Sequence, residues 1–264
     1  MAALLEVAVP KHTLRVGRVP AKALVEVVSA LIEGARLASR LRAWSESEIE
    51  VASLVGGVVS LEAPAMDSDE TAIDYFSDVL TTALSGNRES LLADRPLLDA
   101  CARFSRACPA GLELVRSNGI ALNLRPSDVS VLEHLHDVTP GNRAVRVAGN
   151  LKPESTPGMA TLVVANGDSV RVRFAGVVPV GTRTVVSGIG HFGPSGACFL
   201  VDAECVGAEV PGDELFAEVP RSHPLDFVPP SVPPDALTGV NAFLGIWPGD
   251  ETDEELLAAL RAIR

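Results

Sequence analysis

Three short stretches hold residue types that can bind a metal ion or a phosphate: His134-Leu-His136-Asp137, residues 188–196, which are rich in glycine, and Asp67-Ser-Asp-Glu70. The histidines are two residues apart, so their side chains would not lie on the same face of a helix. No Gly-Lys-Ser/Thr follows the glycines, and strand patterns flank them, which favours a hairpin loop over a phosphate loop. The acidic stretch lacks calcium-loop spacing and precedes a helix, where acidic residues are favoured.

The four cysteines do not form a metal-binding set. Cys101 and Cys108 lie in a helical pattern, about 10 Å apart along the helix axis, which is too far for a disulfide. Cys198 and Cys205 lie in a strand pattern and would face opposite sides of a regular strand. No Ser-His-Asp or Cys-His arrangement is readable either. We therefore expect no metal, no cofactor and no enzymatic activity.

The elements that would position these residues mix helices and strands over residues 1–140. Residues 4–9 alternate like a strand, and an amphipathic helix begins at Pro20. Two further helices follow, the second beginning near Pro96, and a short helix is expected from Ser127 to His136. These helices are interleaved with hairpins.

Two hairpins are expected in this region. Residues 49–63 turn at Gly56-Gly57, and residues 112–124 turn at Asn118-Gly119, a strong hairpin signal. Because hairpins replace strict βαβ repeats, residues 1–140 predict an α+β domain with an antiparallel sheet and helices.

Residues 142–210 predict a small all-β barrel. Four strand patterns follow one another, at 144–151, 160–174, 183–189 and 197–206, and the second is a hairpin that turns at Asn166-Gly167-Asp168. Five strands in a segment of this length fit an OB-fold or SH3-like barrel, and the order of strands and turns resembles small OB-like modules.

Barrels of this kind often bind oligonucleotides, which gives an alternative function for the chain. The candidate nucleic-acid-binding residues are Arg146, Arg171, Arg173 and Arg183. Arg171 and Arg173 should share one strand face because they are two residues apart. Nearby acidic residues almost cancel this charge, and the segment has no Tyr or Trp for base stacking. A structural or protein-binding barrel is therefore the preferred interpretation.

The end of the chain predicts a linker and a docking element. Prolines punctuate residues 211–241, as expected for an extended linker. Residues 242–264 form the docking segment, in which Thr252 and Glu255 make a capping box. An apolar stripe comes next, formed by Leu256, Leu257, Leu260 and Ile263. So short a helix is marginal alone in water, so it needs a surface, on its own body or on a partner.

Bulk composition narrows the class of protein. The formal net charge is -12, and from residue 211 onward ten acidic residues face three arginines. Such a tail disfavours non-specific binding to nucleic acid or membranes and favours basic partners. The N-terminus lacks signal-peptide features and no apolar run reaches transmembrane length, so a cytoplasmic location is expected. The scarcity of lysine suggests a GC-rich bacterial genome.

The segment Trp247–Arg264, with Trp-Pro-Gly-Asp-Glu-Thr-Asp-Glu-Glu-Leu-Leu-Ala-Ala-Leu at its start, resembles the C-terminal tails of bacterial antitoxins that are paired with PIN-domain ribonuclease toxins. The resemblance implies a tail that wraps a protein partner, with Trp247 as apolar anchor and a terminal arginine, Arg261 or Arg264, in an acidic pocket. The rest of the chain departs from that family, since no DNA-binding head is readable. We therefore expect a non-catalytic, antitoxin-like protein that binds its partner through this segment.

Overall fold

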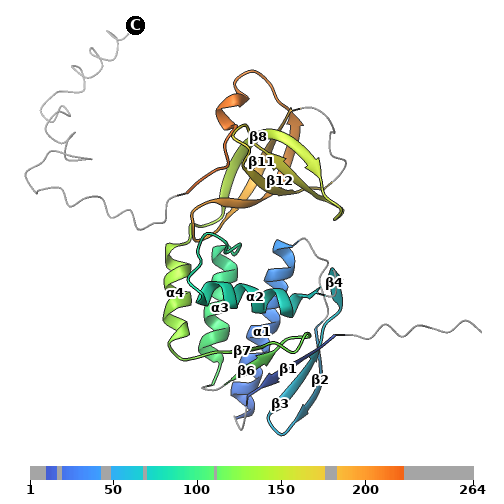
Figure 1. Ribbon diagram of the computed structural model, residues 1–264, viewed down its shortest axis with the longest axis vertical. Coiled ribbons are helices and arrows are strands. Elements are labelled where there is room, and N and C mark those ends of the chain that lie inside the picture. The colour runs from blue at the N-terminus through green and yellow to red at the C-terminus, as the bar shows by residue number, and fades with distance from the viewer. Residues whose placement is uncertain are drawn as a thin grey trace, which may run out of the picture. The chain divides into compact units, whose positions relative to one another are not determined.

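The computed structural model describes residues 10–16, 20–42, 49–67, 70–109, 112–175 and 183–222. By its contacts the chain divides into two units, residues 1–226 and residues 227–264. The strand expected at residues 4–9 and the helix expected near the C-terminus lie outside the described residues. The described part of the first unit is mixed α+β (Figure 1).

The first sheet is antiparallel, as expected. Its strands are β1 (Lys11–Arg15), β2 (Glu50–Val55), β3 (Val58–Glu62), β6 (Glu113–Val115) and β7 (Ala121–Asn123), in the order β2-β3-β1-β6-β7. Both expected hairpins are confirmed: β2 pairs with β3 and β6 pairs with β7. Gly56 and Gly57 both have positive φ, which the two-residue turn between β2 and β3 requires.

Helices cover one face of this sheet (Figure 1). They are α1 (Ala21–Leu41), α2 (Ala72–Leu84), α3 (Arg95–Ala107) and α4 (Asp128–Val138). The short strands β4 (Ala65–Asp67) and β5 (Glu70–Thr71) precede α2. Pro20 stands at the N-cap of α1 and Asp94 caps α3 just before Pro96, so both expected helix starts are confirmed. Phe76 and Phe104, fully buried, meet edge to face with ring centroids 5.6 Å apart between α2 and α3.

The second half of the described unit is a closed five-stranded barrel. Its strands are β8 (Arg143–Pro153), β9 (Met159–Val163), β10 (Ser169–Arg173), β11 (Arg183–Phe192) and β12 (Cys198–Ala208), closed in the order β10-β12-β11-β8-β9. All pairs are antiparallel except β10 with β12. Val147, Leu162, Val172, Phe192 and Val201 belong to its core.

The glycine-rich stretch is not simply the loop that the sequence suggested. β11 continues through Gly188 and Gly190 to Phe192, and the turn begins only at Gly193. A side chain at Gly188 would collide with the Asp202 carbonyl on β12, and one at Gly190 would lie 2.8 Å from Val145 on β8. These glycines therefore allow close approach of neighbouring strands.

The barrel is joined to the helical half by buried contacts. Met159 of β9 and Leu200 of β12 belong to the same buried cluster as the helices. At the start of the expected linker, residues 211–222 hold the 3-10 helix η1 (Asp213–Phe216) and a bridge between Ala197 and Arg221. No helix in the described ranges is long and apolar enough to cross a membrane.

Candidate functional site

The seven expected partner-binding residues all fall in the second unit of the chain, outside the described residues: Trp247, Leu256, Leu257, Leu260, Arg261, Ile263 and Arg264. Their role stays a prediction. The first unit offers four other features: the barrel arginines, two buried polar clusters and one exposed strand.

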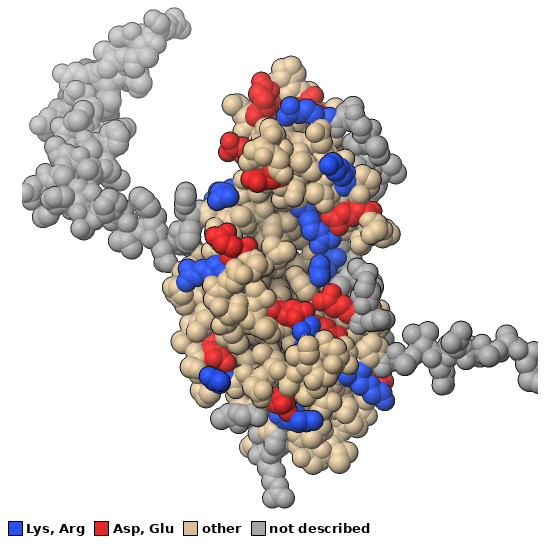
Figure 2. Space-filling view, viewed as in Figure 1, with Lys and Arg blue, Asp and Glu red and all other residues tan. Residues whose placement is uncertain are grey.

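Each of the four barrel arginines pairs with a carboxylate of its own chain. The pairs are Arg146 with Asp213 at 2.7 Å, Arg171 with Glu154 at 2.8 Å, Arg173 with Asp202 at 2.6 Å, and Arg183 with Glu209 at 2.5 Å. Figure 2 shows acidic and basic side chains interspersed on the visible face. A phosphate would have to compete with a carboxylate at every one of these arginines.

Arg171 and Arg173 do share the outer face of β10, as expected, because Val170 and Val172 beside them are buried. Arg171 makes a bidentate contact with Glu154, whose two oxygens accept from Nε at 3.2 Å and from a terminal nitrogen at 2.8 Å. The hydrogen bond from Arg171 outweighs partial burial and lowers the pKa of Glu154. Glu154 and Arg171 thus form an ion pair with two hydrogen bonds on the barrel surface.

A cavity of about 350 Å³ adjoins Arg171. Phe199 and Leu92 are among its lining residues, together with Thr161 from β9 and Arg221 from the segment after the barrel. Its two arginines are offset by carboxylates, because Arg171 pairs with Glu154 and Asp168 is also part of the lining. The cavity thus brings the ring of Phe199 near Arg171 and Arg221 at the barrel surface.

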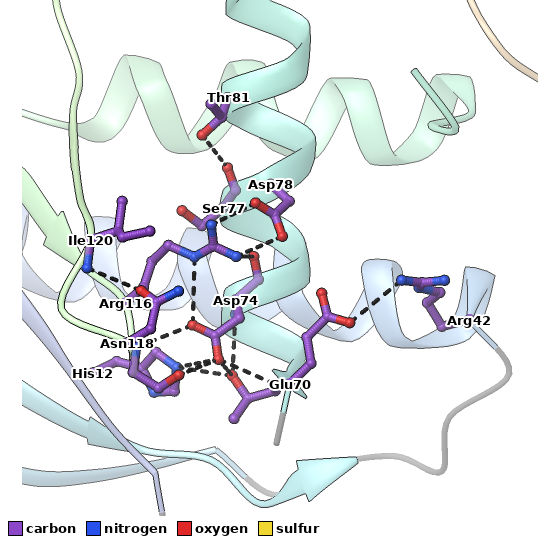
Figure 3. Close-up of polar contacts among 12 residues, drawn as sticks. His12, Arg42, Glu70, Asp74, Ser77, Asp78, Thr81, Arg116, Asn118 and Ile120 are labelled. Atoms are coloured by element: carbon purple, nitrogen blue, oxygen red, sulfur yellow. Dashed lines mark hydrogen bonds and ion pairs between the residues drawn. The ribbon is translucent and has the colours of Figure 1, made fainter. Parts of the chain in front are cut away.

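The first polar cluster is centred on Asp74 of α2 and lies between that helix and the sheet (Figure 3). Asp74 Oδ2 accepts from the Thr71 hydroxyl at 2.9 Å and from the Ser117 hydroxyl at 2.8 Å, and it lies 3.2 Å from His12 Nε2. Thr71 and Asp74 also form a capping box at the start of α2. Arg116 adds a pair of 2.6 Å contacts to the Asp78 carboxylate.

The Asp74 cluster does not have the geometry of a catalytic triad. Thr71 and Asp74 both contact Nε2 of His12, so the imidazole does not stand between a hydroxyl and a carboxylate. Burial alone would raise the pKa of Asp74, but hydrogen bonds from His12, Ser117 and Thr71 and the charge of His12 hold it well below its usual value. The cluster joins β1, α2 and the β6–β7 turn.

The second polar cluster is centred on His191 of β11. Its Nδ1 donates to Asp94 at 2.8 Å and its Nε2 donates to Asp202 at 3.0 Å. Burial opposes protonation, but the hydrogen bonds and charges of Asp202 and Asp94 outweigh it and raise the pKa of His191 to about 9. Asn142 also donates to Asp94, at 2.9 Å. Sequence reasoning missed this cluster.

The two histidines of α4 are not brought together as ligands. His134 contacts Arg88 at 2.9 Å, whereas His136 accepts from Arg95 at 3.3 Å and donates to Asp137 at 2.9 Å. All four cysteines are free. Over the described ranges no group of three or more His, Cys, Asp or Glu could hold a metal ion.

The exposure of strand β2 is a further feature that sequence reasoning missed. All six of its residues are exposed, including Val51, Leu54 and Val55. The strand was expected, but its apolar residues gave no sign that they would remain uncovered.

Comparison of the chain with family models, with curated proteins and with solved structures finds no match.

Proposed function

We propose that this chain is a non-catalytic protein-binding protein that engages its partner through residues 242–264, as the antitoxin-like member of a bacterial toxin pair. The observation that carries the proposal is the amphipathic pattern of the last residues, with its own capping box, behind a proline-rich linker. The prolines of residues 211–241 support it, because they separate this segment in sequence from the barrel.

The energetics of a short helix favour a docking role. Leu256, Leu257, Leu260 and Ile263 would each contribute roughly 1.5–3 kcal/mol if a surface covered them fully. The ring of Trp247 would add the large apolar contact that dominates many interfaces. The described body already buries two cores of its own, one under the helices and one in the barrel. We therefore assign the apolar stripe to a partner surface.

The partner class comes from the resemblance of the tail. It implies a PIN-type ribonuclease with an apolar groove for Trp247 and an acidic pocket for Arg261 or Arg264. This pairing would take place in the cytoplasm of a bacterium, where such a ribonuclease would meet RNA.

The direct test is inhibition of RNA cleavage by a PIN-type ribonuclease encoded beside this chain. The full-length chain should inhibit, Trp247→Ala should inhibit much more weakly, and Asp250→Asn should inhibit like the unaltered chain, because an exposed charge contributes little. Equal inhibition by Trp247→Ala and Asp250→Asn would remove Trp247 from the interface. Failure of the full-length chain to inhibit would remove this partner class.

The second candidate function is nucleic-acid binding through an OB-like barrel. The strand order of the barrel favours this function. Starting from β8, the strands close in the order β8-β9-β10-β12-β11, and β10 and β12 are parallel. This is the arrangement of a five-stranded Greek-key barrel. The cavity that contains Phe199 and Arg171 is a further point in favour. Against it, all four candidate arginines are paired with carboxylates.

A further inference from the structure

Strand β2 concentrates exposed apolar side chains on one element. Val51 is 51%, Leu54 is 54% and Val55 is 73% exposed, which makes three of the nine large apolar side chains that are exposed in the described part of the chain. Single exposed apolar residues are ordinary, whereas a run of them on one strand marks an interaction surface.

The position of β2 in the sheet gives this run its meaning. Within the described strands β2 is an edge: it pairs with β3 on one side only. Edge strands present unpaired N–H and C=O groups and are commonly protected by lysine, proline or a short length. β2 has six residues, Glu-Val-Ala-Ser-Leu-Val, with no lysine, arginine or proline. The opposite edge, β7, has only three residues.

A bulge turns two of these side chains toward the helix-covered face. The register of β2 on β3 shifts between Val51 and Ser53, so Val51 stands opposite Leu61 and Leu54 stands opposite Val59. Residues opposite each other share a face of the sheet. Leu61 and Val59 are buried on the core face, whereas Val51 and Leu54 on the same face are half exposed. The apolar core face therefore continues past the cover of the helices.

We propose that β2 is a self-association edge, to which β2 of a second copy adds in antiparallel orientation across a two-fold axis. Such pairing would satisfy the outward backbone groups of both strands and join the two uncovered apolar strips. It is independent of the proposed function of the C-terminal segment.

Charge favours a second copy as the occupant. Glu50 is the only charged residue of β2, and it stands at one end of the strand. In an antiparallel pair centred between Ala52 and Ser53, Val51 of each copy stands opposite Leu54 of the other, and Glu50 stands opposite Val55, so like charges do not face each other. A closed two-fold interface also uses the same patch on both copies, which requires no further surface.

The test is sedimentation equilibrium of the full-length chain over a concentration range, with Leu54→Lys as the variant and Leu215→Lys as the matched control. Leu215 lies on η1 and is 83% exposed, so it carries the same change away from the edge. One six-residue strand makes a small interface, so we expect a micromolar dissociation constant. Leu54→Lys should weaken association at least about tenfold, which is about 1.4 kcal/mol, while Leu215→Lys should match the unaltered chain.

Hydrogen exchange gives a second readout if Leu54→Lys fails to fold. The amides of residues 50–55 should exchange more slowly at concentrations above the dissociation constant than below it, and Val51→Lys should abolish this dependence. A chain that remains monomeric at a concentration on the order of 10⁻⁴ M overturns the proposal. In that case a different protein or another segment of the chain covers β2. An association that Leu54→Lys leaves intact overturns it as well.

Discussion

His191 Nδ1 on β11 lies 2.8 Å from Asp94 Oδ2 at the start of α3, so one hydrogen-bonded ion pair joins the barrel to the helical half of the first unit. The other oxygen of Asp94 accepts from the backbone N–H of Leu97 at 3.1 Å and caps α3. The opposite side of the imidazole meets Asp202, which also pairs with Arg173. The charge of His191 is therefore shared between two carboxylates from distant parts of the sequence.

Replacing His191 should destabilise the body. In His191→Gln, the buried Asp94 and the half-buried Asp202 lose a cation, and we expect a loss of about 2–4 kcal/mol in the free energy of unfolding. Urea denaturation measures this change. His134→Gln is the matched control, because His134 is exposed on α4, and it should change stability by less than about 0.5 kcal/mol. Equal effects of the two variants would contradict a structural role for His191.

The same residue predicts a pH dependence. The pKa of His191 is raised from 6.5 to about 9 in the folded state. As pH rises, the unfolded chain therefore releases this proton before the folded chain does. The contribution of protonated His191 to the free energy of unfolding is complete below pH 6.5 and is lost as pH rises to about 9. The melting temperature should fall over this range, and His191→Gln should flatten that part of the profile. A profile that is identical in both proteins would show that His191 does not carry the effect.

Asp74 and Asp78 form a matched pair on α2, since both contact Arg116. Asp74 is buried and Asp78 is half exposed, so Asp74→Ala should cost about 3–5 kcal/mol and Asp78→Ala less than about 1 kcal/mol. The pKa of Asp74 is lower in the folded chain than its unfolded value of 3.8. The ionised carboxylate therefore adds to the free energy of unfolding above pH 3.8, and this contribution is lost as pH falls below that value. Chemical denaturation at neutral and acidic pH measures both effects. A larger loss from Asp78→Ala would contradict this assignment.

The barrel should not bind single-stranded oligonucleotides beyond a non-specific level. Arg171 and Arg173 are neutralised by Glu154 and Asp202, so few phosphates could be bound without breaking these pairs. Fluorescence anisotropy at physiological salt measures the affinity, with the double change Arg171→Glu and Arg173→Glu as the comparison. Micromolar or tighter binding that the double change abolishes, and that falls steeply with salt, would favour the nucleic-acid function.

Local signals were sufficient to predict most of the described secondary structure. The Asn166-Gly167-Asp168 turn and the alternation around it predict the β9–β10 hairpin, which the structure confirms. Pro96, a favoured first helical residue, predicts a helix start near it, and α3 begins at Arg95. In both places the backbone preference of a few neighbouring residues decides the structure. The short β4 and β5 have too few residues to show a period, and they were not expected.

The polar clusters and the exposed edge could not be predicted from local patterns. His191 and Asp94 are far apart in the sequence, and only the tertiary fold brings them to 2.8 Å. Leu54 lies in the hairpin that was expected at residues 49–63, but its exposure depends on the place of β2 in the strand order. Trp247 and the apolar stripe near the C-terminus stay predictions, since they lie outside the described residues.

The central claim is that the segment near the C-terminus, and not the body, binds the partner. The most direct measurement is the dissociation constant of a PIN-type ribonuclease encoded beside this chain, determined by calorimetry for the full-length chain and for a chain that ends at Asp226, the last residue of the first unit. We predict that the shortened chain melts at the same temperature and binds at least about 100-fold more weakly, since interface energy is concentrated in a few anchors such as Trp247. A shortened chain that keeps full affinity, or one that unfolds because its core is incomplete, would contradict the claim.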